Sequence, residues 1–272
     1  MDVRVLGPLV VTEAGLDAMP TAVKPRKVLA LLAMNPGRTV HLSTLTEELW
    51  NGHPPRSAVT TLQTYVLQIR NRIGRALLRD PQARTHNAKH ILVTRLEGYV
   101  LNTSGGFFDA GSFQYQAELG HQAMAAGRLA EAVDRFGRAL TMWRGPALVD
   151  VQLGPVLEVQ VTRLEEARTA ALQGRIGAEL ALGRHHELLS ELTALTARHP
   201  LNEVLHAQFM YALHACERRA DALAVYARLE RVLRRELGLA PDRELRRLRA
   251  AILECVPDLS PYLPQPLGAA AR

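Results

Sequence analysis

Residues 55–74, PRSAVTTLQTYVLQIRNRIG, decide the fold of the N-terminal part of this chain because their apolar residues recur with the period of a helix. At 100° per residue, one face within about a quarter of a turn carries four aliphatic side chains, Leu62, Val66, Ile69 and Ile73. We predict that this face is buried. The opposite face contains no carboxylate and carries Ser57, Thr60, Gln63, Thr64, Gln68 and Asn71, flanked by Arg56, Arg70 and Arg72.

The polar face of residues 55–74 favours a recognition helix. Amphipathic surface helices usually mix both signs of charge, whereas short polar groups and arginines without carboxylates suit base edges and phosphates. The alternative is an ordinary solvated helix face. Hydroxyl and amide groups pair with base edges, so the candidates for base contacts are Thr60, Gln63, Thr64 and Gln68. The candidates for phosphate contacts, which position a protein without specifying sequence, are Arg56, Arg70, Arg72 and Arg95.

The residues before this helix predict short strands and a first helix. Residues 2–12 are rich in aliphatic and β-branched residues and are broken by Gly7-Pro8, which is typical of a hairpin or small sheet. Pro25 opens a helix over 25–35, and Gly37 closes it. Basic residues at the start of this helix are candidates for DNA backbone contacts or simply a solvated helix end, and these are Lys24, Arg26 and Lys27.

A second helix is predicted in residues 42–50, LSTLTEELW, before the recognition helix. Ser43 is expected as its N-cap, with Glu47 and Glu48 in the first turn opposing the helix dipole. Gly52 ends this helix, and two prolines then force a turn. Three helices in sequence, the third polar and basic on its outer face, indicate a helix-turn-helix unit.

A β-hairpin is predicted over residues 90–103, HILVTRLEGYVLNT, with its two strands around residues 95–98. One interpretation is a structural hairpin that covers the core. The other, which we favour because of the helices before it, is a wing whose Arg95 reaches phosphate or the minor groove.

Composition and charge restrict the class of protein. The 272 residues are 47% apolar, and the two cysteines, Cys216 and Cys255, form neither a disulfide framework nor a zinc site. We find no secretion signal and no run of 18 apolar residues, so we expect a cytoplasmic, nucleoid-associated protein without a membrane partner. The net charge of +6 lies in residues 1–104, which hold 13 Lys or Arg against 7 Asp or Glu. This clustering favours an anionic partner for that part of the chain.

Residues 105–255 predict helical hairpins that repeat. Gly127, Gly183 and Glu217 are each followed by apolar residues at offsets of 5, 9 and 12, namely Ala132, Phe136 and Ala139, then Leu188, Leu192 and Leu195, then Ala222, Tyr226 and Leu229. The last two starts are 34 residues apart, the tetratricopeptide period, and about 22 residues are inserted between the first two. The alternative is an unrelated helical bundle. Stacked hairpins leave a concave surface typical of partner binding.

Enzyme and metal chemistry have no convincing candidate in the sequence. There is no phosphate-binding Gly-rich loop followed by Lys-Ser or Lys-Thr, and no nucleophile elbow. His185 and His186 are consecutive, so on a helix they point about 100° apart and do not share a metal as an i, i+4 pair would. We therefore predict no enzyme, no catalytic or metal-binding residues and no cofactor.

The N-terminal hundred residues resemble the DNA-binding domain of the Streptomyces antibiotic regulatory protein (SARP) family, which is similar to the OmpR-type winged helix. The resemblance is carried by VRVLGPLVV, PRKVLALLAMNPGRTV, LTEELWNGHPP, SAVTTLQTYVLQIRNRIG and LEGYVL, and residues 49–67 are its most specific part. One departure lies at residues 69–72, Ile-Arg-Asn-Arg, where family members often have a Leu-Arg-Arg-like end. The charge is kept, but the base preference is expected to differ.

The remaining chain resembles the bacterial transcriptional activator domain of the same family over nearly all of 109–253, through FDAGSF, ALTMWRGPAL, LEEAR, HPLNEVLHAQFMYAL and YARLERVLRRELGLAPDRELRRLRAAIL. The predicted fold is mainly α with a small β component: a winged helix-turn-helix over 1–104, an all-α tetratricopeptide-like domain over 105–255, and a disordered proline-rich tail over 256–272.

The resemblance implies a DNA-binding transcriptional activator of a secondary-metabolite, antibiotic-type gene cluster. It implies double-stranded DNA with direct repeats near the −35 region, two protomers side by side as a homodimer on DNA, and recruitment of RNA polymerase holoenzyme. Two alternatives stay open at this point. One is a repressor with the same DNA-binding domain, and the other is a protein-interaction scaffold in which the helical repeats do the binding.

Overall fold

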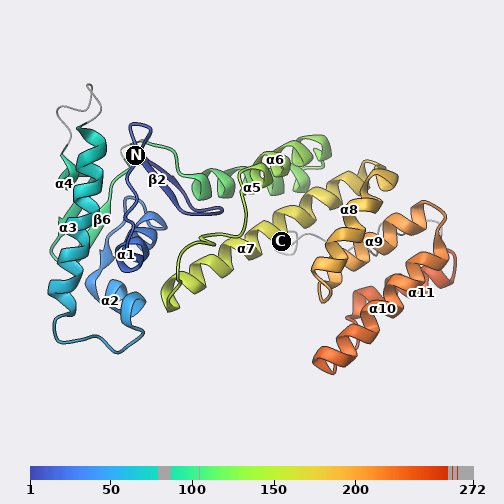
Figure 1. The fold of residues 1–272 in the computed structure, drawn as a ribbon. Helices are drawn as coiled ribbons and strands as arrows, with labels where there is room; N and C mark the ends of the chain where they lie inside the picture. Colours follow the sequence, from blue (N-terminus) through green and yellow to red (C-terminus); the bar gives the residue numbers. More distant parts are fainter. Residues whose placement is uncertain (79–86, 104, 257–258, 260–261, 263–272) are drawn as a thin grey trace. The chain divides into compact units, whose positions relative to one another are not determined.

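The computed structural model describes residues 1–78, 87–103, 105–256, 259 and 262 (Figure 1). Its described residues form many helices and two small antiparallel sheets, which confirms the predicted fold class. The chain divides into two compact units. Unit 1 consists of Met1–Tyr115 and Ala139–Arg168, and unit 2 consists of Gln116–Arg138 and the described part of Thr169–Arg272.

Unit 1 begins with a three-stranded antiparallel sheet, as predicted for residues 2–12. Its strands are β1 (Asp2–Arg4), β2 (Val10–Glu13) and β3 (Leu16–Asp17), in that order. Gly7 breaks the chain between β1 and β2 with a φ of +143°. A Cβ at this position would lie 2.9 Å from the Cβ of Arg144, so the turn packs too closely for any other residue.

The three predicted helices are present, and each starts a few residues away from its predicted position. They are α1 (Val23–Ala33), α2 (Leu42–Trp50) and α3 (Ala58–Leu77). Helix α1 starts two residues before Pro25, which still lies in the first turn, where a missing N–H costs little.

Ser43 is not the N-cap of α2, because the helix already begins at Leu42 and His41 holds the cap position without a side-chain bond. Glu47 and Glu48 consequently lie beyond the first turn. The reason is tertiary: β4 (Val40–His41) pairs with β6 (Gly98–Leu101), and the next N–H, that of Leu42, donates to the carbonyl of Glu97 at 2.9 Å.

The predicted hairpin is confirmed. Strand β5 (Leu92–Arg95) pairs with β6 through a two-residue turn, and the second sheet has the order β4-β6-β5. Gly98 is required at the β4–β6 crossing, since a Cβ there would lie 2.1 Å from the carbonyl oxygen of Val40. The sequence interpretation missed α4 (Ala88–Ile91), which is capped by the side chain of Asn87 accepting from the N–H of Lys89.

Three carboxylates join the helix-turn-helix to later parts of unit 1. Asp109 accepts the N–H groups of Val5 and Leu6 at 2.8–3.1 Å, and Asp150 accepts the N–H of Leu9 at 2.8 Å. Asp150 also pairs with the guanidinium of Arg26, and Glu48 accepts N–H groups at the start of α7 (Pro155–Ala181). The predicted domain boundary after residue 104 therefore falls inside unit 1.

The predicted hairpin repeat is confirmed by the backbone. The turns between α5 (Asp109–Ala125) and α6 (Leu129–Thr141), between α7 and α8 (His185–Arg198), and between α9 (Glu203–Ala215) and α10 (Arg219–Leu237) contain Gly127, Gly183 and Glu217. All three residues have left-handed φ angles, of +71°, +82° and +58°. The insertion between the first two starts is taken up by a longer loop before α7 and by the greater length of α7, which has 27 residues.

Small residues allow close helix contact in unit 2. A Cβ at Gly120 or Gly174 would lie within 2.8 Å of the ring of Phe136, which is fully buried. The apolar residues at offsets 5 and 9 after each turn are buried as well: Ala132 and Phe136, Leu188 and Leu192, Ala222 and Tyr226.

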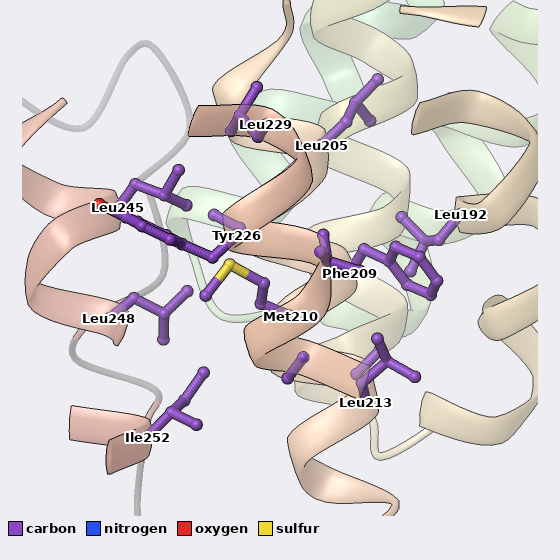
Figure 2. Packing of buried hydrophobic residues seen from close by; sticks show 14 of the residues in the cluster. Leu192, Leu205, Phe209, Met210, Leu213, Tyr226, Leu229, Leu245, Leu248 and Ile252 are labelled. Carbon is purple, nitrogen blue, oxygen red and sulfur yellow. The ribbon is translucent and has the colours of Figure 1, made fainter. Parts of the chain in front are cut away.

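The main core of unit 2 is built around α9 (Figure 2). Phe209, Met210 and Leu213 of α9 lie among side chains of α8, α10 and α11 (Arg243–Leu253), including Leu192, Tyr226, Leu229, Leu245, Leu248 and Ile252. Leu259 is 2% exposed in the same cluster, and Tyr262 packs against it. Most of the predicted disordered tail lies outside the described residues.

Replacing Glu217 with glycine is expected to raise the free energy of unfolding of unit 2 by up to about 1 kcal/mol. A non-glycine residue in the left-handed region is strained, and glycine removes this strain at the cost of a more flexible unfolded chain. Urea denaturation followed by circular dichroism measures the change. Replacing Gly183 with alanine is the matched control and is expected to destabilise; an increase in stability would contradict the assignment of these turns.

Acidification is expected to destabilise unit 2, because burial lowers the pKa of three of its histidines, His121, His185 and His206. For His206 the hydrogen bond to the carbonyl of Asn202 opposes this shift, and the charge of Arg228 adds to it. A lowered pKa means that the folded state prefers neutral histidine. The stabilisation from this preference is fully present at a pH above the ordinary histidine pKa of 6.5, and it is lost as the pH falls below that value.

The His206→Gln variant measures how much His206 contributes to the loss of stability on acidification, because glutamine keeps a donor for Asn202 but does not titrate. Its urea midpoint is expected to fall less than that of the unchanged chain between about pH 7.5 and about pH 5.5. Parallel curves for the two proteins would show that His206 does not contribute.

Candidate nucleic-acid interface

Helix α3 buries the predicted face and exposes the predicted polar one. Leu62, Val66, Ile69 and Ile73 are at most 1% exposed. The four candidates for base contacts, Thr60, Gln63, Thr64 and Gln68, are all solvent-exposed. The hydroxyl of Thr64 donates to the carbonyl of Thr60 at 3.1 Å, which leaves its oxygen lone pairs free to accept. Helix α3 contains no Asp or Glu.

Sequence reasoning missed two aliphatic residues on the same helix. Val59 is 51% exposed and Leu67 is 57% exposed, and Leu67 lies between Thr64 and Asn71 on the helix surface. Apolar side chains at such positions contact thymine methyl groups in a major groove. The sequence carried this signal for Leu67, which points away from the buried face at 100° per residue, whereas Val59 falls beside that face.

The candidates for phosphate contacts differ in their exposure and in the partners of their guanidinium groups. Arg56 is exposed and makes no ion pair or hydrogen bond through its side chain within the described residues. Arg95 is exposed at the end of β5, next to Leu96, which is 99% exposed at the wing tip. Arg72 donates to the hydroxyl of Thr21 at 3.4 Å. It lines a hollow of about 260 Å³ beside the start of α1, together with Gln68, Asn71 and Arg75.

The basic residues at the start of α1 have other partners. Arg26 pairs with Asp150, and Lys27 is 8% exposed and donates to the carbonyl of Glu48 at 3.4 Å. Lys24 lies over the ring of Trp50, at 5.6 Å from its centroid, and stays exposed. Of these three, only Lys24 keeps a solvent-facing position that suits a backbone contact.

Arg70 connects α3 to the wing. Its Nε and Nη2 donate to the carbonyl of Leu92 at 3.0 and 2.7 Å, and Nη2 also donates to the hydroxyl of Thr94 at 2.8 Å. Burial lowers the pKa of Arg70, and the charge of Tyr99 opposes this shift, but an arginine remains charged. A phosphate contact by Arg70 stays a prediction and would have to use Nη1.

The first turns of α1 to α4 differ in charge from those of α5 to α11. Within the residues the structure describes, α1, α2, α3 and α4 have no acidic residue in their first turns. Each of α5 to α11 has one there: Asp109, Glu131, Glu158, Glu187, Glu203, Asp221 and Glu244. The positive ends of α1, α2 and α3 therefore carry no acidic side chain from their own first turns.

No three His, Cys, Asp or Glu side chains in the part of the chain that the structure describes are placed to hold a metal ion. No helix in the same part is long and apolar enough to cross a membrane.

Two family profiles match this chain in sequence order. Residues 19–101 match the C-terminal domain of transcriptional regulatory proteins, and residues 108–253 match the bacterial transcriptional activator domain. The first covers the helix-turn-helix and the wing. The second covers α5 to α11, more than half of the chain.

Similar proteins match over nearly the whole chain. Regulatory protein DnrI of Streptomyces peucetius is 44% identical over 273 residues, covering 100% of this chain and 98% of that protein. Regulatory protein AfsR of Streptomyces coelicolor is 37% identical over 257 residues, covering 94% of this chain and 24% of AfsR.

A solved structure agrees with these matches. The structure of Mycobacterium tuberculosis EmbR in complex with a low-affinity phosphopeptide has a TM-score of 0.84 and 34% identity, covering 94% of this chain and 66% of EmbR. Because both profiles and full-length relatives agree, the protein belongs to the Streptomyces antibiotic regulatory protein family of transcriptional regulators.

Proposed function

We propose that this protein activates transcription by binding direct repeats near the −35 region and recruiting RNA polymerase holoenzyme, with two protomers side by side on the DNA. The genes controlled are proposed to form a secondary-metabolite cluster. The observation that carries DNA binding is the exposed face of α3, which combines hydroxyl, amide and arginine side chains without a single carboxylate.

In this proposal α3 enters the major groove. Gln63 and Gln68 pair with base edges, and Thr60 and Thr64 accept or donate single hydrogen bonds. Val59 and Leu67 supply the apolar contacts to thymine methyl groups, since both are about half exposed on the same helix. The wing follows the adjacent backbone, with Arg95 on phosphate and Leu96 at the minor groove.

Phosphate binding is supported by two independent features. Arg56 has an exposed guanidinium without a carboxylate partner in the described residues. The first turns of α1, α2 and α3 lack acidic residues, so no carboxylate of their own opposes a phosphate at these helix ends. Such contacts release counterions, and binding is expected to weaken steeply with salt.

Footprinting of the chain on the promoters beside its own gene tests the proposal, with polymerase holoenzyme added in a second lane. Protection of a direct repeat near −35, with stronger polymerase protection in the presence of the chain, is the expected result. Protection that excludes polymerase would make the protein a repressor. Absence of protection at moderate salt would favour a protein-interaction scaffold.

Paired variants test the roles of the α3 residues. Gln63→Ala is expected to weaken the free energy of binding to the correct site by about 1–3 kcal/mol and to change binding to unrelated DNA little. Arg56→Gln is expected to weaken binding to all sequences alike and to reduce the salt slope by about one. Arg198→Gln, an exposed arginine of α8, is the control. Identical behaviour of the first two variants across sequences would contradict the assignment.

A further inference from the structure

Unit 1 contains a second hollow, of about 360 Å³, which the proposed function does not use. Three segments line it: the turn after α1 with Met34 and Arg38, the start of α5 with Phe108 and Gln114, and the middle of α7 with Arg163 and Leu164. Ligand pockets in proteins begin at about this size. The hollow thus joins the end of a helix that packs on α3 to two later helices of the same unit.

The charge of this hollow is positive and unneutralised. Arg38 and Arg163 are exposed and make no ion pair through their side chains within the described residues, and no Asp or Glu lines the hollow. Asp109, the residue after Phe108, turns instead to the N–H groups of Val5 and Leu6. Two guanidinium groups therefore share one cavity without a carboxylate.

Arg163 forms no ion pair in the described residues, although an acidic residue lies one turn away on α7. Glu166 follows it at the i, i+3 spacing that pairs Arg128 with Glu131 and Arg218 with Asp221. No such ion pair forms at Arg163 in the described structure. Its guanidinium instead remains available at the wall of the hollow.

The rest of the wall is apolar or uncharged. Met34, Phe108 and Leu164 provide apolar surface, and Gln114 provides an amide. An arginine binds a carboxylate through two parallel hydrogen bonds, and the apolar wall favours a flat hydrocarbon body on the same molecule. We propose that this hollow is a binding site for a small organic anion, a carboxylate carried on an aromatic or similarly flat apolar group.

A ligand that binds only the folded state stabilises that state by mass action. Occupancy here would hold the end of α1 to α5 and α7 and would stabilise unit 1 as a whole. This site does not depend on DNA binding, so its test contains no DNA.

The test titrates the full chain with 1-anilinonaphthalene-8-sulfonate, an aromatic organic anion whose fluorescence reports binding. One saturable site is expected, with naphthalene-2-carboxylate displacing the dye. Arg38→Gln and Arg163→Gln are each expected to weaken dye binding by about tenfold. Arg198→Gln, outside the hollow, is expected to leave it unchanged.

Two further measurements keep the proposal falsifiable. Gln114→Trp, an exposed position at the hollow, is expected to fill the space and exclude the dye while circular dichroism stays native. Naphthalene-2-methanol, the neutral analogue, is expected to displace the dye poorly. Dye binding that is indifferent to both arginine variants, equal displacement by the neutral analogue, or displacement by inorganic phosphate as effective as by the carboxylate would each overturn the proposal.

Discussion

Replacing Glu48 with alanine is expected to lower the free energy of unfolding of unit 1 by about 2–4 kcal/mol. Glu48 is 2% exposed, and its carboxylate accepts the N–H groups of Gly154 at 2.6 Å, Val156 at 3.0 Å and Leu157 at 2.9 Å. These donors lie at the start of α7 and have no partner within that helix. Alanine would leave all three without an acceptor and would remove a negative charge from the positive end of the helix dipole.

Tryptophan fluorescence during urea denaturation measures this effect selectively. The chain has two tryptophans, Trp50 and Trp143, and both belong to unit 1. Glu47→Ala is the matched control, because Glu47 is the exposed neighbour on the same helix, and a change within about 0.5 kcal/mol is expected. Equal effects of the two variants would show that the carboxylate of Glu48 does not stabilise unit 1.

Glu48 also bears on how the chain is divided. A boundary after residue 104 would separate Glu48 from the start of α7. It would also separate Leu9 and Arg26 from their partner Asp150, and Val5 from its partner Asp109. We infer that the helix-turn-helix is stabilised by residues that the sequence assigns to the following domain. The carboxylates connect backbone N–H groups across about a hundred positions in sequence, so no local pattern indicates them.

The elements that the sequence predicted correctly depend on local patterns. The spacing of Leu62, Val66, Ile69 and Ile73 defines the buried face of α3 whatever surrounds it. The repeat after Gly127 and Gly183 was strong enough to put Glu217 at the glycine position, and the structure gives it a left-handed φ, although glutamate rarely adopts one. In both cases each residue's position follows from its own neighbours in the chain.

The failures concern residues whose role is decided by distant partners. Ser43 is a good N-cap by type, but pairing of Val40 and His41 with β6 starts α2 two residues too early for it. Glu48 was expected to interact with the dipole of its own helix and instead caps α7. Arg70 carries the same positive charge as Arg56 in the sequence, and only the packing of β5 beside α3 distinguishes the two.

Replacing Arg70 with methionine is expected to weaken DNA binding by about tenfold without reducing the salt slope, and to lower the stability of unit 1 by about 1–3 kcal/mol. Methionine keeps the aliphatic stem but removes every hydrogen bond to the carbonyl of Leu92 and the hydroxyl of Thr94. The wing would then lose its fixed position beside the recognition helix. Amide hydrogen exchange over β5 and β6 should accelerate even in the absence of DNA.

Arg56→Met is the matched comparison, because Arg56 is exposed and has no side-chain partner within the described residues. It is expected to leave stability and wing exchange unchanged while reducing the salt slope by about one. If Arg70→Met instead behaved as expected for Arg56→Met, Arg70 would act mainly as a phosphate contact, and its hydrogen bonds to β5 would not matter for DNA binding. A loss of affinity at constant salt slope, together with faster exchange in the wing, would mean that Arg70 acts on DNA through the position of the wing.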